Sequence, residues 1–293
     1  MNQARSIAAT FTAKDTLEGA GVHLRRGFSN LEAPRLDPFL LFDDFSSDIP
    51  EHYLAGFPWH PHRGMETVTY ILDGAVRHKD SLGNEGVIEN GAVQWMTAGS
   101  GIIHEEMPES VNGIRGFQLW VNLPKEQKMT EPKYQDLVAS MVPDVTLAPG
   151  VHARIIAGSL AGITGPLKSV SGDPLYLDLS LEANAVARIS IPDGHTVFAY
   201  IIEGALGVDA EIFNERATSP EVDSYAPGTI ILFEREGNEV VLRAPAAGAR
   251  FLLIAGAPLR EPIAWHGPVV MNTDEELREA FADLHNGTFI RHR

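Results

Sequence analysis

The residues best suited to chemistry in this sequence are His60-Pro-His62 and, later in the chain, His104-Glu-Glu106. Side chains two positions apart in a β-strand point to the same face. If both segments are strands, His60 and His62 share one face, and so do His104 and Glu106. Three imidazoles and a carboxylate on the inner wall of a β-barrel would form a mononuclear metal site. We therefore predict that His60, His62, His104 and Glu106 bind one ion.

The available ligand types limit which ion this is. The chain has no cysteine, so thiolate ligands and disulfides are excluded. Imidazole with carboxylate suits one divalent transition metal per chain, namely Fe(II), Mn, Co, Ni, Cu or Zn. Four protein ligands leave an octahedral ion two positions for water, substrate or dioxygen, which favours Fe(II) and oxygen chemistry. The alternative is that these are ordinary surface or core histidines near a turn, although two pairs with period 2 favour the metal.

Two further acidic residues lie beside the motifs. Glu105 is out of phase with His104, so we expect it to point away as a solvated charge. Glu66 is in phase with His62 and could be a ligand, an acceptor for an imidazole N–H, or the ion-pair partner of a residue such as Arg63. The last two roles are preferred.

Large apolar residues crowd both motifs. A pocket lined by them could hold a flat aromatic ligand. Since most large apolar residues of a barrel form its core, the core is the better prediction for any one of them. The residues are Phe57, Trp59, Trp95, Met96, Phe117 and Trp120.

Composition restricts the partners. Lys and Arg total 23 against 39 Asp and Glu, a net charge of −16. Non-specific binding to nucleic acid or to an anionic membrane needs clustered positive charge, so neither is expected, whereas a protein partner is compatible. Residues 1–13 show no signal peptide, and no apolar run reaches the length of a membrane span. We expect a cytoplasmic protein.

The fold is expected to be all-β. The chain holds 27 Gly and 19 Pro, and short runs rich in β-branched and aromatic residues recur between them. The sequence YILDGAV (70–76) is echoed by YIIEGAL (200–206), which indicates two copies of one barrel joined between Pro124 and Pro149. Ser190 and Pro192 stand at the positions that match His60 and His62. The second barrel should therefore be metal-free.

The end of the chain predicts one amphipathic helix. Its apolar residues follow helical spacing at Leu277, Ala280, Phe281 and Leu284. Thr273 and Glu276 fit a capping box, and Gly287 stands where a C-cap glycine would.

At these motifs the sequence resembles the pirin family of the cupin superfamily. FPWHPHRGMETVTY (57–70) is similar to the family's first metal motif, and QWMTAGSGIIHEEMP (94–108) resembles its second. LDPFLLFD (36–43), LWVNLP (119–124), PLREP (258–262) and HGPVVMNT (266–273) also fit. The likeness spans nearly the whole chain.

The resemblance implies a bicupin, that is, two tandem double-stranded β-helix (jelly-roll) barrels with a C-terminal helix. Residues 1–130 would be the metal-binding barrel, and residues 131–293 the metal-free barrel plus the helix. The family's ligands fall on His60, His62, His104 and Glu106, with iron as the usual metal.

The function that the resemblance implies is cleavage of a flavonol such as quercetin by O₂, with Glu106 as the candidate catalytic base. The alternative is a metal- or redox-dependent regulatory protein that binds a transcription factor or a metabolic enzyme. The metal, the natural substrate and the oligomeric state are left open.

Overall fold

A computed structural model of the chain describes residues 3–168, 170–208 and 224–292. It divides into two compact units. The first unit comprises Lys14–Met141 and Leu259–Arg293, and the second comprises Met1–Ala13 and Val142–Pro258. The boundary expected at 130/131 stays a prediction. By their contacts, the last residues of the chain group with the earlier barrel and the first residues group with the later one.

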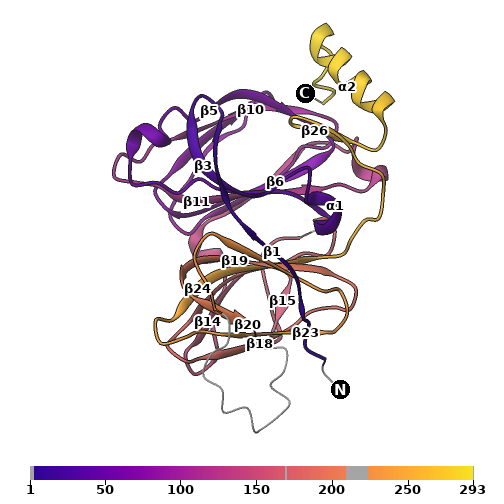
Figure 1. Cartoon of the computed structure of the whole chain (residues 1–293). Helices are drawn as coiled ribbons and strands as arrows, with labels where there is room; N and C mark the ends of the chain where they lie inside the picture. The colour runs from indigo at the N-terminus through magenta and orange to yellow at the C-terminus, as the bar shows by residue number, and fades with distance from the viewer. Residues whose placement is uncertain (1–2, 169, 209–223, 293) are drawn as a thin grey trace. The chain divides into compact units, whose positions relative to one another are not determined.

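The first unit contains a large and a small antiparallel sheet (Figure 1). The large sheet has the spatial order β12 (Lys133–Leu137), β9 (Val93–Thr97), β6 (Met65–Asp73), β11 (Arg115–Asn122), β4 (Phe39–Asp44), β3 (Val22–Phe28) and β2 (Lys14–Glu18). The small sheet has the order β5 (Phe57–His62), β10 (Ile102–Pro108), β7 (Val76–Asp80) and β8 (Glu85–Ile88).

Shorter elements complete the first unit. They are the hairpin β25 (Ala264–His266) and β26 (Val269–Met271), the helices α1 (Ala33–Leu36) and α2 (Asp274–Asn286), and the 3₁₀ turns η1 (Pro50–His52), η2 (Lys125–Gln127) and η3 (Ala139–Met141).

The second unit repeats the architecture. Its large sheet has the order β1 (Ile7–Thr12), β22 (Thr229–Phe233), β19 (Thr196–Gly204), β24 (Ala249–Gly256), β17 (Leu175–Leu181), β14 (Val151–Ala157) and β13 (Asp144–Ala148). Its other sheets are β18 (Val186–Ser190), β23 (Glu239–Arg243), β20 (Leu206–Val208) and β21 (Ser224–Tyr225), and the pair β15 (Ser159–Leu160) and β16 (Ile163–Thr164). The predicted all-β fold of two barrels with a C-terminal helix is confirmed.

The interiors of the two barrels differ chemically. The core of the second unit is a continuous cluster of aliphatic and aromatic side chains, including Leu177, Ile189 and Phe251. Burial of such side chains is the main stabilising term of a folded domain. The second unit also buries a few polar side chains such as Asp178, but among the described residues the buried imidazoles, including His62, lie in the first unit together with Glu106. A polar interior is costly unless hydrogen bonds or an ion satisfy it.

Helix α2 begins and ends where its capping residues predict. The Thr273 hydroxyl accepts from the backbone N–H of Glu276, and the Glu276 carboxylate accepts from that of Thr273, which completes the capping box. Gly287 follows with φ of 71°, a left-handed conformation that favours glycine. No helix among the described residues is long and apolar enough to cross a membrane.

Arg63 ties the tail after α2 to the strand that carries His62. Its buried guanidinium donates to the carbonyl oxygens of Ser100 (2.7 Å) and Phe289 (2.9 Å) and to Asp283 Oδ2 (2.8 Å). It also lies 4.2 Å from the centre of the Phe289 ring. The end of the chain is therefore held beside the His60-Pro-His62 motif by charge-assisted hydrogen bonds.

The Asp283–Arg63 pair predicts a pH-dependent contribution to stability. Hydrogen bonds from Arg63, and further ones from Arg291 and Thr288, lower the pKa of Asp283 to about 2. An aspartate in the unfolded chain has a pKa of about 3.9. The stabilisation is therefore complete above about pH 5 and is lost as the pH falls through about 4 to 2.

Asp283→Asn is expected to lower the melting temperature at pH 7 by about 2–4 °C, the shift that a loss of about 1 kcal/mol gives. The difference in melting temperature between Asp283→Asn and the wild type should become smaller below about pH 4. Thermal melts from pH 7 to pH 3 measure this, with Glu279→Gln, at an exposed carboxylate of the same helix, as the control. A gap that stays constant down to pH 3 would contradict the linkage.

Candidate metal centre

The pairing of β5 with β10 brings the histidine motifs together. The strands are antiparallel, and His104 lies directly opposite His60, while Ile102 lies opposite His62. Glu106 lies opposite Phe57, so the register shifts and β5 carries one extra residue between Phe57 and His60. Period 2 along β5 then places His62 on the same face as His60.

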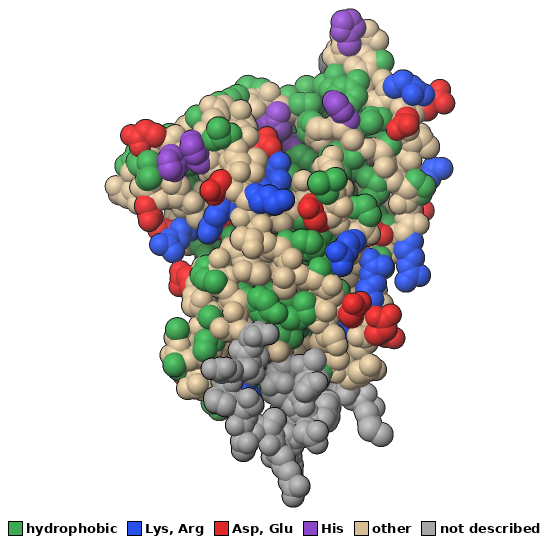
Figure 2. All heavy atoms as spheres, viewed as in Figure 1, with side chains coloured by type: hydrophobic (Ala, Val, Ile, Leu, Met, Phe, Trp, Pro, Cys, Tyr) green, Lys and Arg blue, Asp and Glu red, His purple; other side chains and the backbone are tan. Residues whose placement is uncertain are grey.

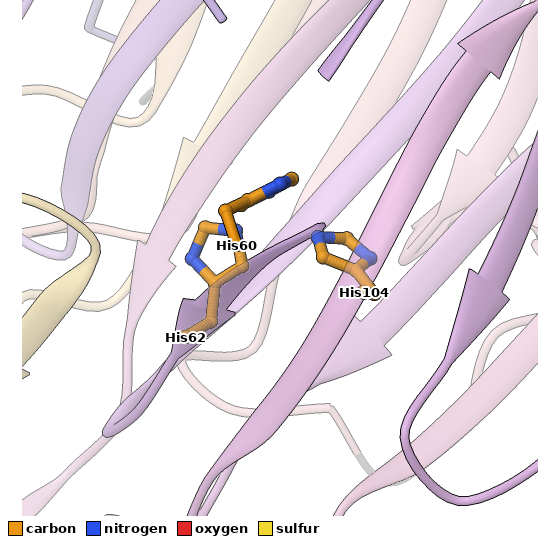
Figure 3. A group of neighbouring side chains, drawn as sticks. All are labelled: His60, His62 and His104. Atoms are coloured by element: carbon orange, nitrogen blue, oxygen red, sulfur yellow. The ribbon is translucent and has the colours of Figure 1, made fainter. Parts of the chain in front are cut away.

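The three imidazoles converge on one space (Figure 3). Their ring centres are 4.5 Å apart for His60 and His104, 4.9 Å for His60 and His62, and 5.1 Å for His62 and His104. One ring nitrogen of each lies within 4.8 Å of the corresponding nitrogens of the others. These separations allow all three nitrogens to reach a single ion at about 2.0–2.2 Å each.

The donor set fits a metal ion. His62 and His104 are each 1% exposed, and within the described chain their ring nitrogens make no hydrogen bond of normal geometry. Buried polar atoms without partners cost free energy, which a bound ion would recover. His60 Nδ1 lies 2.9 Å from the Pro58 carbonyl oxygen. A proton on Nδ1 would leave the Nε2 lone pair of His60 for the ion.

The electrostatics keep these rings in the form that binds metals. Burial lowers the pKa of His104 to about 4; among its charged neighbours, Glu106 acts in the opposite direction and His60 in the same one. Burial, together with His60 and His104, lowers the pKa of His62 well below its usual range, against the effect of the Pro268 backbone. Both rings are therefore neutral at pH 7, as metal ligation requires.

Glu106 lies beside the cluster and is held by hydrogen bonds. Its Oε2 is 3.9 Å from His104 Nε2, too far for a hydrogen bond. Oε1 accepts from Thr69 Oγ1 at 3.0 Å, and Gln118 Nε2 donates to both carboxylate oxygens, at 3.2 and 2.9 Å. Burial opposes ionisation, but His104, His60 and these donors lower the pKa of Glu106 overall. It is an ionised carboxylate beside His104, while the group of converging ligand atoms consists of the three imidazoles without it.

The other two acidic residues lie outside the histidine cluster. Glu105 forms an ion pair with Arg77 at 3.4 Å. The buried Glu66 accepts a hydrogen bond of 2.7 Å from Thr97, its cross-strand partner on β9. Arg63 pairs with Asp283, as described above.

A cavity of about 580 Å³ in the first unit reaches His60 and His62. Its walls include the aromatic rings of Phe57, Trp120 and Trp265. On the face shown in Figure 2, histidine side chains are visible among hydrophobic and charged ones. The cavity is large enough for a small aromatic molecule that would lie against the imidazoles.

The crowded apolar residues divide between this cavity and the core. Phe57 and Trp120 line the cavity. Trp95, Met96 and Phe117 are at most 1% exposed and belong to the core. Trp59 is 53% exposed, on the surface next to His60.

Several residues of the site carry no recognisable signal in the sequence. Thr69 and Gln118 are single polar residues in strands, a common pattern. Trp265 and Pro268 line the cavity from a segment far along the chain. In the sequence, the resemblance at residues 258–262 and 266–273 points to this segment.

Comparisons with known proteins identify the family. The Pirin family profile matches residues 21–121, and the profile of the Pirin C-terminal cupin domain matches residues 176–290. The chain belongs to the pirin family.

Its relatives carry two kinds of name. A Pseudomonas aeruginosa protein provisionally named a quercetin 2,3-dioxygenase is 44% identical, over 98% of this chain and 99% of its own. Human pirin is 39% identical, over 98% of this chain and 94% of its own. The crystal structure of a quercetin 2,3-dioxygenase from Acinetobacter baumannii superposes with a TM-score of 0.87 at 35% identity, covering 98% of both chains.

The cluster predicts stoichiometric metal uptake. Protein stripped with a chelator and incubated with Co(II) is expected to keep about one ion per chain after gel filtration. His104→Ala removes one of three convergent nitrogens, so it should keep about a tenth or less. His152→Ala, in the second unit, is the control. Equal cobalt content in His104→Ala and wild type, by elemental analysis, would rule out ligation by His104.

Proposed function

We propose that this pirin is a metal-dependent dioxygenase, with Fe(II) as its ion, that cleaves a flavonol such as quercetin with O₂. The observation that carries the proposal is the position of His60 and His62, which belong to a three-imidazole cluster and also line an aromatic-walled cavity. The names of the Pseudomonas and Acinetobacter relatives support the same reaction class. The expected cytoplasmic location stays a prediction.

His60, His62, His104 and Glu106 would hold the ion. When bound, it supplies a Lewis acid that makes a substrate hydroxyl more acidic and a centre for redox chemistry with dioxygen. The protein supplies the rest. Trp120, Trp265 and Phe57 offer flat apolar surfaces against which an aromatic ring can be oriented and shielded from water.

Glu106 is the proposed base. It is the ionised carboxylate nearest to the cluster and would accept the proton of the substrate hydroxyl. Gln118 lines the cavity and Glu106 does not, and the Gln118 amide bonds to both oxygens of Glu106.

The charged residues of the cavity favour a neutral substrate. Arg26 donates to both carboxylate oxygens of Asp43, at 2.9 and 2.7 Å, and to Glu18 at 2.7 Å. Apart from the proposed ion at His60 and His62, these three charges sum to −1, and the guanidinium is already engaged on two sides. A phenol can donate to these carboxylates, whereas an anionic substituent meets like charge.

Glu106→Gln is expected to keep part of the metal and lose most turnover. The amide preserves the shape but cannot take the proton, so the rate of quercetin loss should fall about 100-fold or more. The assay follows the flavonol's visible absorbance in air, with metal content measured on the same sample. Wild-type turnover in this variant would reject the base role, and no turnover by metal-loaded wild type would reject the dioxygenase.

A sulfonated quercetin is expected to bind more weakly than quercetin. One like-charge contact of about 1 kcal/mol corresponds to a KM about fivefold higher, and the gap should shrink in high salt. Glu18→Gln removes one negative charge from the cavity wall and should reduce the ratio of the two KM values. An identical ratio in wild type and Glu18→Gln would mean that Glu18 does not select charge.

A redox-dependent regulatory protein is the second candidate. It is favoured by Trp59, a large apolar side chain that is exposed next to a histidine of the cluster. The oxidation state of iron could then alter the surface formed by residues 57–63, to which a transcription factor or metabolic enzyme would bind. Absence of flavonol turnover with every first-row metal, together with partner binding that depends on Fe(II) or Fe(III) and is lost in Trp59→Ala, would favour this function.

A further inference from the structure

Glu106 faces two competing demands if the proposed function holds. A carboxylate that binds the ion tightly is a poor base, because its lone pairs are already shared with a cation. A carboxylate that stays free contributes little to metal affinity. The hydrogen bonds that the Glu106 carboxylate accepts decide whether it binds the ion tightly or stays free. These bonds are few.

Gln118 dominates these contacts. Its single amide nitrogen donates to both oxygens of Glu106, at 2.9 Å to Oε2 and 3.2 Å to Oε1. Thr69, the cross-strand partner of Gln118, donates to Oε1 alone. The shorter bond is made to Oε2, which is the oxygen that lies 3.9 Å from His104 Nε2. Gln118 therefore holds the oxygen nearest to the imidazoles.

Trp120 fixes the orientation of the Gln118 amide. Its indole N–H donates to Gln118 Oε1 at 3.0 Å. With the amide oxygen engaged in this way, the NH₂ group must point to Glu106, and a flipped amide would set two oxygens against each other. Gln118 and Trp120 are two positions apart on β11 and so share a face of the strand.

The same pair contacts the cavity. Gln118 and Trp120 both line it, and the Trp120 ring meets His62 edge-on at 5.2 Å between centres. The ring centres of Trp120 and Trp265 are 6.1 Å apart. The wall of the cavity therefore includes Gln118, which bonds to Glu106, and Trp120, which bonds to Gln118.

We propose that Gln118, oriented by Trp120, is a positioning residue that restrains Glu106 from full metal ligation. The restraint weakens the bond between carboxylate and ion and leaves Glu106 able to accept a proton. The inference rests on the proposed function for the metal site, and it adds the residues that set the state of the carboxylate.

The test measures metal affinity without any flavonol. Gln118→Leu keeps the approximate shape but removes the donor to both oxygens, so Glu106 should turn to the cation. Cobalt(II) affinity, from competition with a chelating dye, is expected to rise about three- to tenfold. The visible absorption spectrum of the bound Co(II), which reports coordination, should change as well.

A second variant tests the same interaction in case Gln118→Leu does not fold correctly. Trp120→Phe keeps an aromatic ring but removes the indole N–H that orients the Gln118 amide. Cobalt affinity should therefore rise, as in Gln118→Leu, but by a smaller factor. Trp265→Phe is the matched control. Trp265 lines the same cavity, but its N–H donates to the Gly267 carbonyl oxygen, so cobalt affinity should stay unchanged.

Comparing Gln118→Leu in the wild type and in the Glu106→Gln variant shows whether Gln118 affects cobalt affinity through the Glu106 carboxylate. If Gln118 acts through the carboxylate, Gln118→Leu has no effect on cobalt affinity once Glu106 is replaced. Weaker or unchanged affinity in the single Gln118→Leu variant, or an equal gain in both backgrounds, would overturn the proposal. Quercetin turnover by the wild type is measured separately. Absence of turnover would reject the dioxygenase, whereas the cobalt affinities alone decide whether Gln118 positions Glu106.

Discussion

The register of β5 against β10 places His104 opposite His60 and leaves His62 one pleat further along the same face. Because side chains alternate, a slip of one residue would turn His104 away from its partners and separate the three imidazoles. The remainder of the site depends on this pairing. Neutral rings, a shared space for an ion and access from the cavity all follow once the two strands are aligned. Period 2 along β10, which pairs with β7 without interruption, then sets Glu106 on the same face as His104.

The two barrels of this pirin differ in that the first contains the polar cluster and the second has a hydrophobic core at the matching place. The second unit fills its interior with hydrocarbon, and Ile189 and Ile191 are buried next to the positions that match His60 and His62. Such an interior is stable but offers no ligand to a metal. The first unit places imidazoles, a carboxylate, Thr69 and Gln118 between its sheets. It stabilises them by hydrogen bonds to the carboxylate and leaves ring nitrogens for an ion, so stability and chemistry are divided between two copies of one architecture.

Much of this arrangement was predictable because it follows from local rules. Period 2 placed His60 with His62 on one face, the repeat at 70–76 and 200–206 revealed two barrels, and Thr273, Glu276 and Gly287 marked the ends of α2. Contacts between distant segments were not predictable. No local pattern sets Gln118 against Glu106, or brings Trp265 to the wall of the cavity. The division of six apolar residues between core and cavity likewise depends on tertiary packing, which period and composition do not encode.

The return of residues 259–293 to the first unit affects when the cavity can form. Trp265 and Pro268 supply part of its wall, and the backbone of Arg63, next to His62, bonds to Pro268 and Val270. During synthesis, both histidine motifs leave the ribosome long before these residues are made. The nascent chain therefore contains both histidine motifs first, and the pocket beside them can close only once the last tenth or so of the chain has been made. Until then, the part of the cavity wall that Trp265 and Pro268 supply is missing beside the imidazoles.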